Sequence, residues 1–162
     1  EILLNLDKIN TKFVGVFVTP SESELEQFAK LKLDYFQIYG KYSNEDIKKI
    51  EKKFQIKIIP TIQVKEKRDI YKYKDIEDTS EIILWDSSGY EKSLSWNYEW
   101  LRNVNTKAKK MIAGNITIDT LENLSKLADI IDVSGALETN KVKDTYKIKN
   151  FLLKVKKIND KN

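Results

Sequence analysis

The side chains that could do chemistry in this sequence stand directly after short apolar runs. Asp86 ends one such run, Gly114 and Asn115 follow a second, and Ser134 and Gly135 follow a third. The chain contains neither His nor Cys, which excludes Ser–His and Cys–His dyads, a disulfide framework and thiolate metal sites. Acid–base chemistry must therefore come from Asp, Glu, Lys or Tyr.

Composition favours a single domain that handles a small molecule. Of the 162 residues, 41% are hydrophobic and 33% are charged, as in an ordinary globular domain. The 29 Lys and Arg exceed the 25 Asp and Glu by four, but they are spread along the chain. A nucleic-acid partner is not expected, because such binders gather basic residues into one patch. The mild excess of positive charge suits an anionic small substrate.

Hydropathy gives no sign of a membrane partner. No apolar run approaches the roughly 18 residues that span a bilayer, and nothing resembles a signal peptide. A cytoplasmic location is expected by default.

Short apolar runs alternate with amphipathic segments from one end of the chain to the other. Strands are expected over residues 12–18, 33–39, 56–64, 81–86, 109–113 and 128–133, and helices over 21–31, 43–55, 71–78, 96–104, 117–127 and 143–158. Six βα units with short connections predict a parallel sheet wrapped by helices. An open doubly wound sheet and a closed (β/α)8 barrel both fit, and both place ligands beyond the carboxyl ends of the strands.

Five segments in a fixed order carry a resemblance to a known family. They are VGVFV, LDYFQIYG, ILWDSS with KSLSW, MIAGN, and IDVSGALETNKVKD. In this order and spacing they resemble the phosphoribosylanthranilate isomerase family of tryptophan biosynthesis, which has Val-Gln-Leu-His-Gly in place of FQIYG and Ala-Gly-Gly in place of AGN. The resemblance implies an α/β fold of the (β/α)8 TIM-barrel type, of which this chain carries strands three to eight.

The resemblance leaves the first strand, first helix and second strand of the family without a counterpart. Residues 2–6 read as the tail of a helix, and residues 1–162 are expected to form one barrel domain lacking roughly its first one and a half βα units. About 40 to 50 further residues are implied, either cleaved off or supplied by another chain, with a homo-oligomer as another possible arrangement. In the family this segment carries a Cys thought to be the general base, so the chain alone is expected to be inactive. The alternative is a genuinely shortened paralogue.

For Asp86 the resemblance implies the role of general acid. The carboxyl would protonate the ring oxygen of the phosphoribosyl group and open the furanose, and the Cys base would then take a proton from C2′. This is the Amadori rearrangement of N-(5-phosphoribosyl)anthranilate to 1-(2-carboxyphenylamino)-1-deoxyribulose 5-phosphate, and it needs neither a metal nor an organic cofactor. The alternative is that Asp86 only caps the next loop.

For the small-residue turns the resemblance implies a phosphate site. The loops after the last two strands of such barrels hold phosphate through backbone N–H groups and a short helix. Gly114, Asn115, Ser134 and Gly135 are the binding candidates, with ordinary turn chemistry as the alternative. Asn115 and Gly135 depart from the family, which has a second Gly and a second Ser there.

The other singled-out residues have open or structural interpretations. Gln37 either contacts substrate or makes a buried hydrogen bond. Tyr39 stands near the usual His of the family, and the segment 89–91 replaces its Gly-Ser/Thr-Gly. Structural or packing roles are expected for the remaining matched residues, which are Glu138, Asp144, Trp85, Trp96 and Trp100.

Two further functions stay open at this point. Asn115, Tyr39 and the altered loop after Asp86 suggest a diverged barrel that binds a phosphorylated metabolite without converting it. A related phosphosugar isomerase or a thiamine-pathway barrel would share the phosphate site.

Overall fold

A computed structural model describes residues 11–87 and 95–160 of the protein. It has one six-stranded sheet in which every strand pairs in parallel with the next strand along the chain. The strands are β1 (Val14–Val18), β2 (Tyr35–Tyr39), β3 (Lys57–Val64), β4 (Ile82–Ser87), β5 (Lys109–Ile112) and β6 (Ile130–Ile131). The expected parallel α/β architecture is therefore confirmed.

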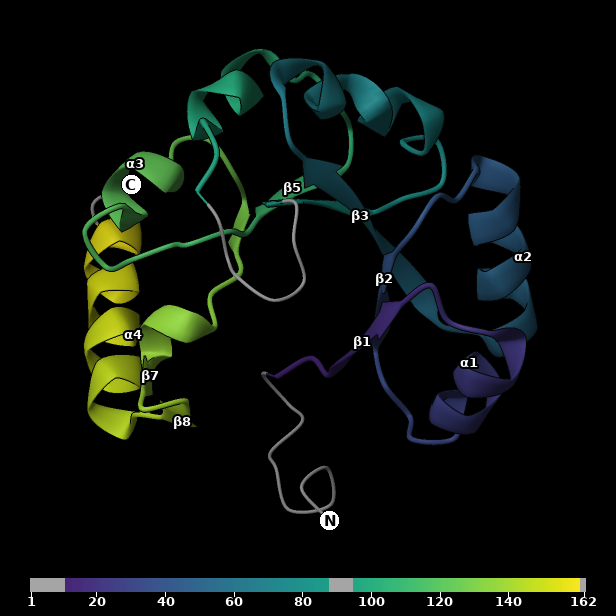
Figure 1. The fold of residues 1–162 in the computed structure, drawn as a ribbon, viewed down its shortest axis with the longest axis horizontal. Helices are drawn as coiled ribbons and strands as arrows, with labels where there is room; N and C mark the ends of the chain where they lie inside the picture. The colour runs from purple at the N-terminus through teal and green to yellow at the C-terminus, as the bar shows by residue number, and fades with distance from the viewer. Residues whose placement is uncertain (1–10, 88–94, 161–162) are drawn as a thin grey trace.

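Helices connect the strands and cover the outer side of the sheet. They are α1 (Glu22–Ala29), α2 (Asn44–Phe54), η2 (Lys67–Asp75), η3 (Tyr98–Asn103), α3 (Leu121–Leu124), η4 (Gly135–Leu137) and α4 (Thr145–Asn159). They follow one another in an arc that runs from α1 and α2 on one side to α4 on the other (Figure 1). A short antiparallel hairpin of β7 (Glu138–Thr139) and β8 (Val142–Lys143), which the sequence did not predict, precedes α4.

Two of the expected α-helices are 3-10 helices. In η2 the buried apolar side chains are Ile70 and Tyr73, and Ile76 is buried directly after the helix. This spacing of three residues matches the three residues per turn of a 3-10 helix, which places all three side chains on one face. The expected helix over 96–104 is likewise the 3-10 helix η3, whereas 117–127 contains only the four-residue α3.

The central strands β3 and β4 are buried on both faces, as the strands of parallel sheets usually are. Alternate side chains of β3 divide between two clusters, as a period of two requires. Ile58 and Ile62 belong to the large cluster that includes helix side chains, whereas Ile59 packs with Leu84 and Ala113 in a small cluster. The small cluster lies on the inner face of the sheet, and the polar side chains described below stand on that same face.

Membrane insertion has no support in the described part of the chain. None of the helices within residues 11–87 and 95–160 is both long enough and apolar enough to cross a bilayer.

Candidate active site

The predicted site residues converge on one cavity of about 640 Å³ at the carboxyl ends of the strands. Its wall includes all six of them: Gln37, Asp86, Gly114, Asn115, Ser134 and Gly135. They come from β2, from β4 and from the segments that follow β5 and β6. Parallel strands end at one edge of the sheet, so residues that are far apart in the sequence meet there. Their convergence is observed, while their roles in binding and catalysis stay predictions.

Hydrogen bonds from two neighbouring residues, Tyr39 and Ser87, hold the Asp86 carboxyl in place. The Tyr39 hydroxyl donates to Oδ2 over 2.8 Å, and the backbone N–H of Ser87 donates to Oδ1 over 2.7 Å. The Gln37 amide Nε2 donates in turn to the Tyr39 hydroxyl oxygen over 3.2 Å. Gln37 and Tyr39 are two residues apart in β2, so both project from the same face of the strand. Gln37 thus makes the buried hydrogen bond that was one of its two predicted roles, and it also lines the cavity.

Tyr39 keeps its proton in this setting. Burial raises the pKa of its phenol, and the negative charge of Asp86 together with the hydrogen bond to that carboxylate raises the pKa further. The hydroxyl is therefore a donor to Asp86 throughout the ordinary range of pH.

Asp132 is a second cavity carboxyl that the sequence did not single out. Burial raises its pKa, the negative charge of Asp86 raises it further, and the positive charge of Lys143 opposes both. The expected strand over 128–133 placed Asp132 inside a strand, whereas β6 ends at Ile131. Its position directly after a strand, the same signal that marked Asp86, could have identified it.

The turn after β5 has a left-handed backbone. Gly114 has φ 104° and Asn115 has φ 45°, a conformation that Asn tolerates better than most residues. The Asn115 side-chain amide donates to the Ser95 hydroxyl over 2.9 Å. Within the described residues, the backbone N–H groups of Gly114 and Gly135 donate to no protein acceptor. Both N–H groups are therefore available to an anion in the cavity.

The turn after β6 is fixed by Lys143, which the sequence also did not single out. Its ammonium group donates to the Ser134 hydroxyl over 2.9 Å and to the Ser134 carbonyl over 3.2 Å, and it pairs with Glu138 at 2.7 Å. A Cβ at Gly135 would meet nothing within 4 Å, so packing does not require glycine there. The structure thus places a fixed positive charge against a residue that lines the cavity.

The residues expected to be structural do make structural contacts. Glu138 pairs with Lys143, and Asp144 caps α4 by accepting from two backbone N–H groups. Trp85 is fully buried, and its indole donates to the Ile70 carbonyl over 3.1 Å. The indole of Trp96 donates to the Ala113 carbonyl over 3.0 Å, which anchors the end of β5. Trp100 packs partly buried against the core.

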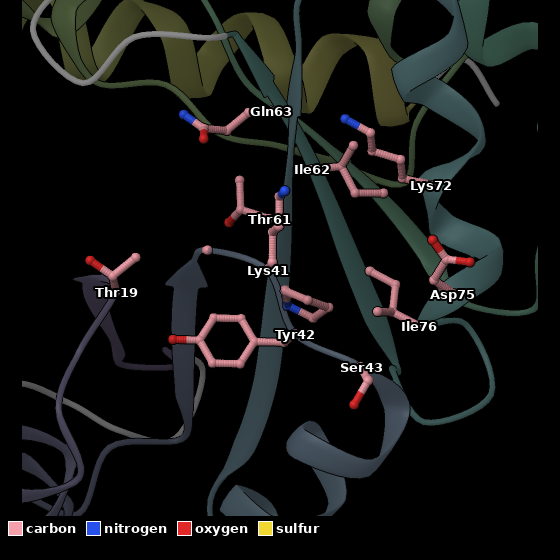
Figure 2. Close-up of a pocket in the computed structure, with 12 residues that line it drawn as sticks. Thr19, Lys41, Tyr42, Ser43, Thr61, Ile62, Gln63, Lys72, Asp75 and Ile76 are labelled. Carbon is pink, nitrogen blue, oxygen red and sulfur yellow. The ribbon is translucent and has the colours of Figure 1, made fainter.

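A second cavity of about 680 Å³ lies between the loop after β2, the strand β3 and η2. Figure 2 shows Thr61 and Gln63 projecting to one side of β3, and Lys72 and Asp75 on the other. The Thr61 hydroxyl is buried without a hydrogen-bond partner among the described residues. None of the predicted site residues lines this cavity, and Lys72 in its wall already pairs with Asp69 at 2.6 Å. The first cavity is therefore the candidate active site.

Some expectations fall outside the described residues, namely those for residues 2–6 and for the segment 89–91. Among residues 11–87 and 95–160, no cluster of acidic side chains has the arrangement of a metal site.

A parallel sheet whose strands pair in sequence order without the reversal of a doubly wound sheet, with a polar cavity at their carboxyl ends, defines the class of TIM-barrel-like α/β proteins. The family model described as N-(5'phosphoribosyl)anthranilate (PRA) isomerase matches residues 2–154. The chain belongs to this family, as the sequence resemblance predicted.

Individual relatives and solved structures agree with this assignment. The chain is 30% identical over 158 residues to the N-(5'-phosphoribosyl)anthranilate isomerase of Clostridium acetobutylicum, covering 92% of this chain and 75% of that protein. It is 29% identical over 151 residues to the enzyme of the same name from Streptococcus mutans, covering 90% of this chain and 72% of that one. The fold matches the crystal structure of phosphoribosyl anthranilate isomerase from Thermotoga maritima with a TM-score of 0.82 and 22% identity, over 96% of this chain and 78% of that chain.

Proposed function

We propose that the protein is a phosphoribosylanthranilate isomerase of tryptophan biosynthesis, an intramolecular oxidoreductase. Its substrate would be N-(5-phosphoribosyl)anthranilate and its product 1-(2-carboxyphenylamino)-1-deoxyribulose 5-phosphate. The observation that carries this proposal is the convergence of the Asp86 carboxyl and the turns at Gly114 and Ser134 on one cavity. Membership of the family supports it. A solved structure of a relative in complex with a reduced form of that product supports it as well. The fold of this chain matches that structure with a TM-score of 0.79 and 21% identity, over 96% of this chain and 76% of that chain.

In this proposal the phosphate group of the substrate binds between the two turns. Among the described residues, no protein acceptor takes the backbone N–H groups of Gly114 and Gly135, and both residues line the cavity, which supports their donating to the phosphate oxygens. The Lys143 ammonium, held against Ser134, adds positive charge next to the same turn. Oriented N–H groups and a nearby cation are the usual protein partners of a phosphate.

Asp86 then acts as the general acid. Its carboxyl gives a proton to the ring oxygen, and the bond from C1′ to that oxygen breaks while the anilino nitrogen lone pair forms a double bond to C1′. A base removes the C2′ proton to give an enol. The enol becomes the ketone as C1′ takes up a proton and the O2′ hydroxyl releases one. The proton gained by the base replaces the one given by Asp86, so no atom is gained or lost overall. A positioned acid contributes about 10² to 10⁴ in rate.

A finer part of the proposal concerns completion of the barrel. The six strands correspond to strands three to eight of a (β/α)8 barrel, and two further strands between β6 and β1 would close it. The inner face of β1 supports this, because Val14, Val16 and Val18 are 38%, 59% and 49% exposed. An exposed apolar strand at the edge of a sheet can pair with other chains, so another segment is expected to cover it. The added segment, from this polypeptide or another, would also supply the base, because the resemblance to the family implies a Cys base in that segment.

The direct test is an isomerase assay that follows the loss of anthranilate fluorescence. It compares the 162-residue chain with the same chain joined to the first βα units of the Clostridium acetobutylicum relative. Turnover by the joined protein, and none by the chain alone, is the expected result. Turnover by both would remove the need for a completing segment. If neither turns over substrate but calorimetry detects binding of the product analogue, the protein is a non-catalytic metabolite-binding barrel.

A further inference from the structure

We propose that Tyr39 is a positioning residue, whose hydroxyl orients the Asp86 carboxyl and stabilises the carboxylate that forms when Asp86 releases its proton. The inference rests on the proposed function for the identity of the reaction. The contact between the two side chains does not depend on that function.

The direction of the hydrogen bond follows from the partner on the other side of Tyr39. The Gln37 amide group donates to the phenol oxygen at 3.2 Å, so it occupies an acceptor position of that oxygen. A phenol has a single hydrogen to donate, which leaves it for Asp86 Oδ2 at 2.8 Å. The Gln37 side chain is only 4% exposed, so the residues packed around it hold in place the amide group that donates to Tyr39. The hydroxyl of Tyr39 is therefore aimed at Asp86 before any substrate enters.

The charges around Asp86 explain why such a donor is needed. In the described residues the titratable groups that act on or respond to its carboxylate are Tyr39 of β2, Tyr98 of η3 and Asp132 after β6. Lys143 of β8 pairs with Glu138, and its positive charge also lowers the pKa of Asp132. Ionised Asp132 repels the Asp86 carboxylate, and the partly buried cavity strengthens that repulsion. The hydrogen bond from the Tyr39 hydroxyl to Oδ2 stabilises the Asp86 carboxylate against this repulsion.

The chemical consequence falls on the proton-transfer step. When the Asp86 O–H bond breaks and the proton moves to the ring oxygen, negative charge develops on Asp86. A neutral hydrogen bond from Tyr39 then becomes charge-assisted, and such bonds are roughly twice as strong. Stabilisation that grows toward the transition state raises kcat rather than lowering KM. Tyr39 keeps its own proton throughout, so it stabilises the charge on Asp86 without taking part in the proton transfer itself.

The first test is kinetic and uses the protein that turns over substrate in the assay above. Tyr39→Phe keeps the ring and removes the donor, and kcat is expected to fall about tenfold with KM within about twofold. The alkaline limb of the kcat profile should move to higher pH, because a carboxylate without its donor holds its proton longer. Tyr39→His retains an N–H donor and should recover part of the loss.

The matched control is Tyr73→Phe. The Tyr73 hydroxyl is also hydrogen-bonded, to the Asn105 carbonyl over 3.2 Å, but it lies outside the cavity. This variant should leave kcat and its pH profile unchanged. Equal losses in Tyr39→Phe and Tyr39→His with an unmoved pH profile would reduce Tyr39 to a packing role and overturn the proposal.

A second test does not depend on activity and separates this proposal from the isomerase function. The Cζ resonance of Tyr39 is measured by NMR at neutral pH in the 162-residue chain and in its Asp86→Asn variant. It should move in the variant, because the charge and the strong acceptor at the hydroxyl are gone. An unchanged Tyr39 resonance would overturn the proposal. A changed resonance, together with a joined protein that does not turn over substrate, would support the contact and refute only the isomerase.

Discussion

The carboxyl groups of Asp86 and Asp132 face the same cavity, one from β4 and one from the segment after β6. Burial raises the pKa of Asp132, and the negative charge of Asp86 raises it further. Two neighbouring carboxylates in a partly desolvated site are costly to ionise together, so Asp132 favours its protonated form. The site therefore combines a fixed carboxyl with a neighbouring one that favours its protonated form.

Asp132→Asn should raise the stability of the protein at neutral pH. The folded-state pKa of Asp132 lies above its unfolded value, so the folded state loses stability as pH rises between those two values and stays less stable above them. The variant should melt about 2 °C higher than wild type at pH 7, with no difference below about pH 3, where both states are protonated.

Thermal melts followed by circular dichroism at pH 3, 5 and 7 measure this difference. The exposed residue Asp119 provides the control, since Asp119→Asn should leave the melting temperature unchanged at each pH. A lower melting temperature of Asp132→Asn at pH 7 would show that the ionised carboxylate stabilises the fold.

Asn115 should tolerate glycine but not alanine. Its φ of 45° costs an alanine about 1 to 2 kcal/mol, and alanine also loses the hydrogen bond to Ser95. Asn115→Ala should therefore melt about 3 °C lower than wild type, whereas Asn115→Gly should stay within about 1 °C. Calorimetry with the reduced product analogue should show unchanged or tighter binding in Asn115→Gly, because the turn becomes more open. Weaker binding in the glycine variant than in the alanine variant would contradict the proposed phosphate site.

Lys143 should matter for anion binding, whereas its neighbour Lys147 should not. Lys143→Met removes the ammonium group that contacts Ser134, and affinity for the product analogue is expected to fall about tenfold, with a weaker dependence on salt. Lys147→Met is the matched control, because the Lys147 ammonium group contacts the Glu138 carbonyl over 2.6 Å. Equal affinity losses in the two variants, measured by calorimetry, would assign the effect to general surface charge.

The sequence predicted the order of strands and the edge on which the polar residues meet. Apolar runs alternating with amphipathic segments are enough to place Asp86, Gly114 and Ser134 after strands, and parallel pairing then brings them together. The helix expected over 21–31 is α1, and Ser21 and Glu24 form a capping box at its start.

The features that the sequence did not predict depend on the register between strands and on the burial of individual side chains. Tyr39 reaches Asp86 across β3, where Tyr39 pairs with Thr61 and Gln63 pairs with Asp86, and no local pattern fixes that alignment. The raised pKa of Asp132 depends on which atoms exclude water around it. The 3-10 geometry of η2 follows from tertiary packing of Ile70 and Tyr73, since their spacing also fits one face of an α-helix.

The proposed function depends most on the acid role of Asp86, and Asp86→Asn tests it most directly. The asparagine is nearly isosteric but has no proton of suitable acidity. In the assay with the joined protein, turnover should fall by at least about 10², while calorimetry shows product-analogue affinity within about threefold of wild type. Turnover within twofold of wild type in a folded Asp86→Asn protein would contradict this role of Asp86 in the reaction.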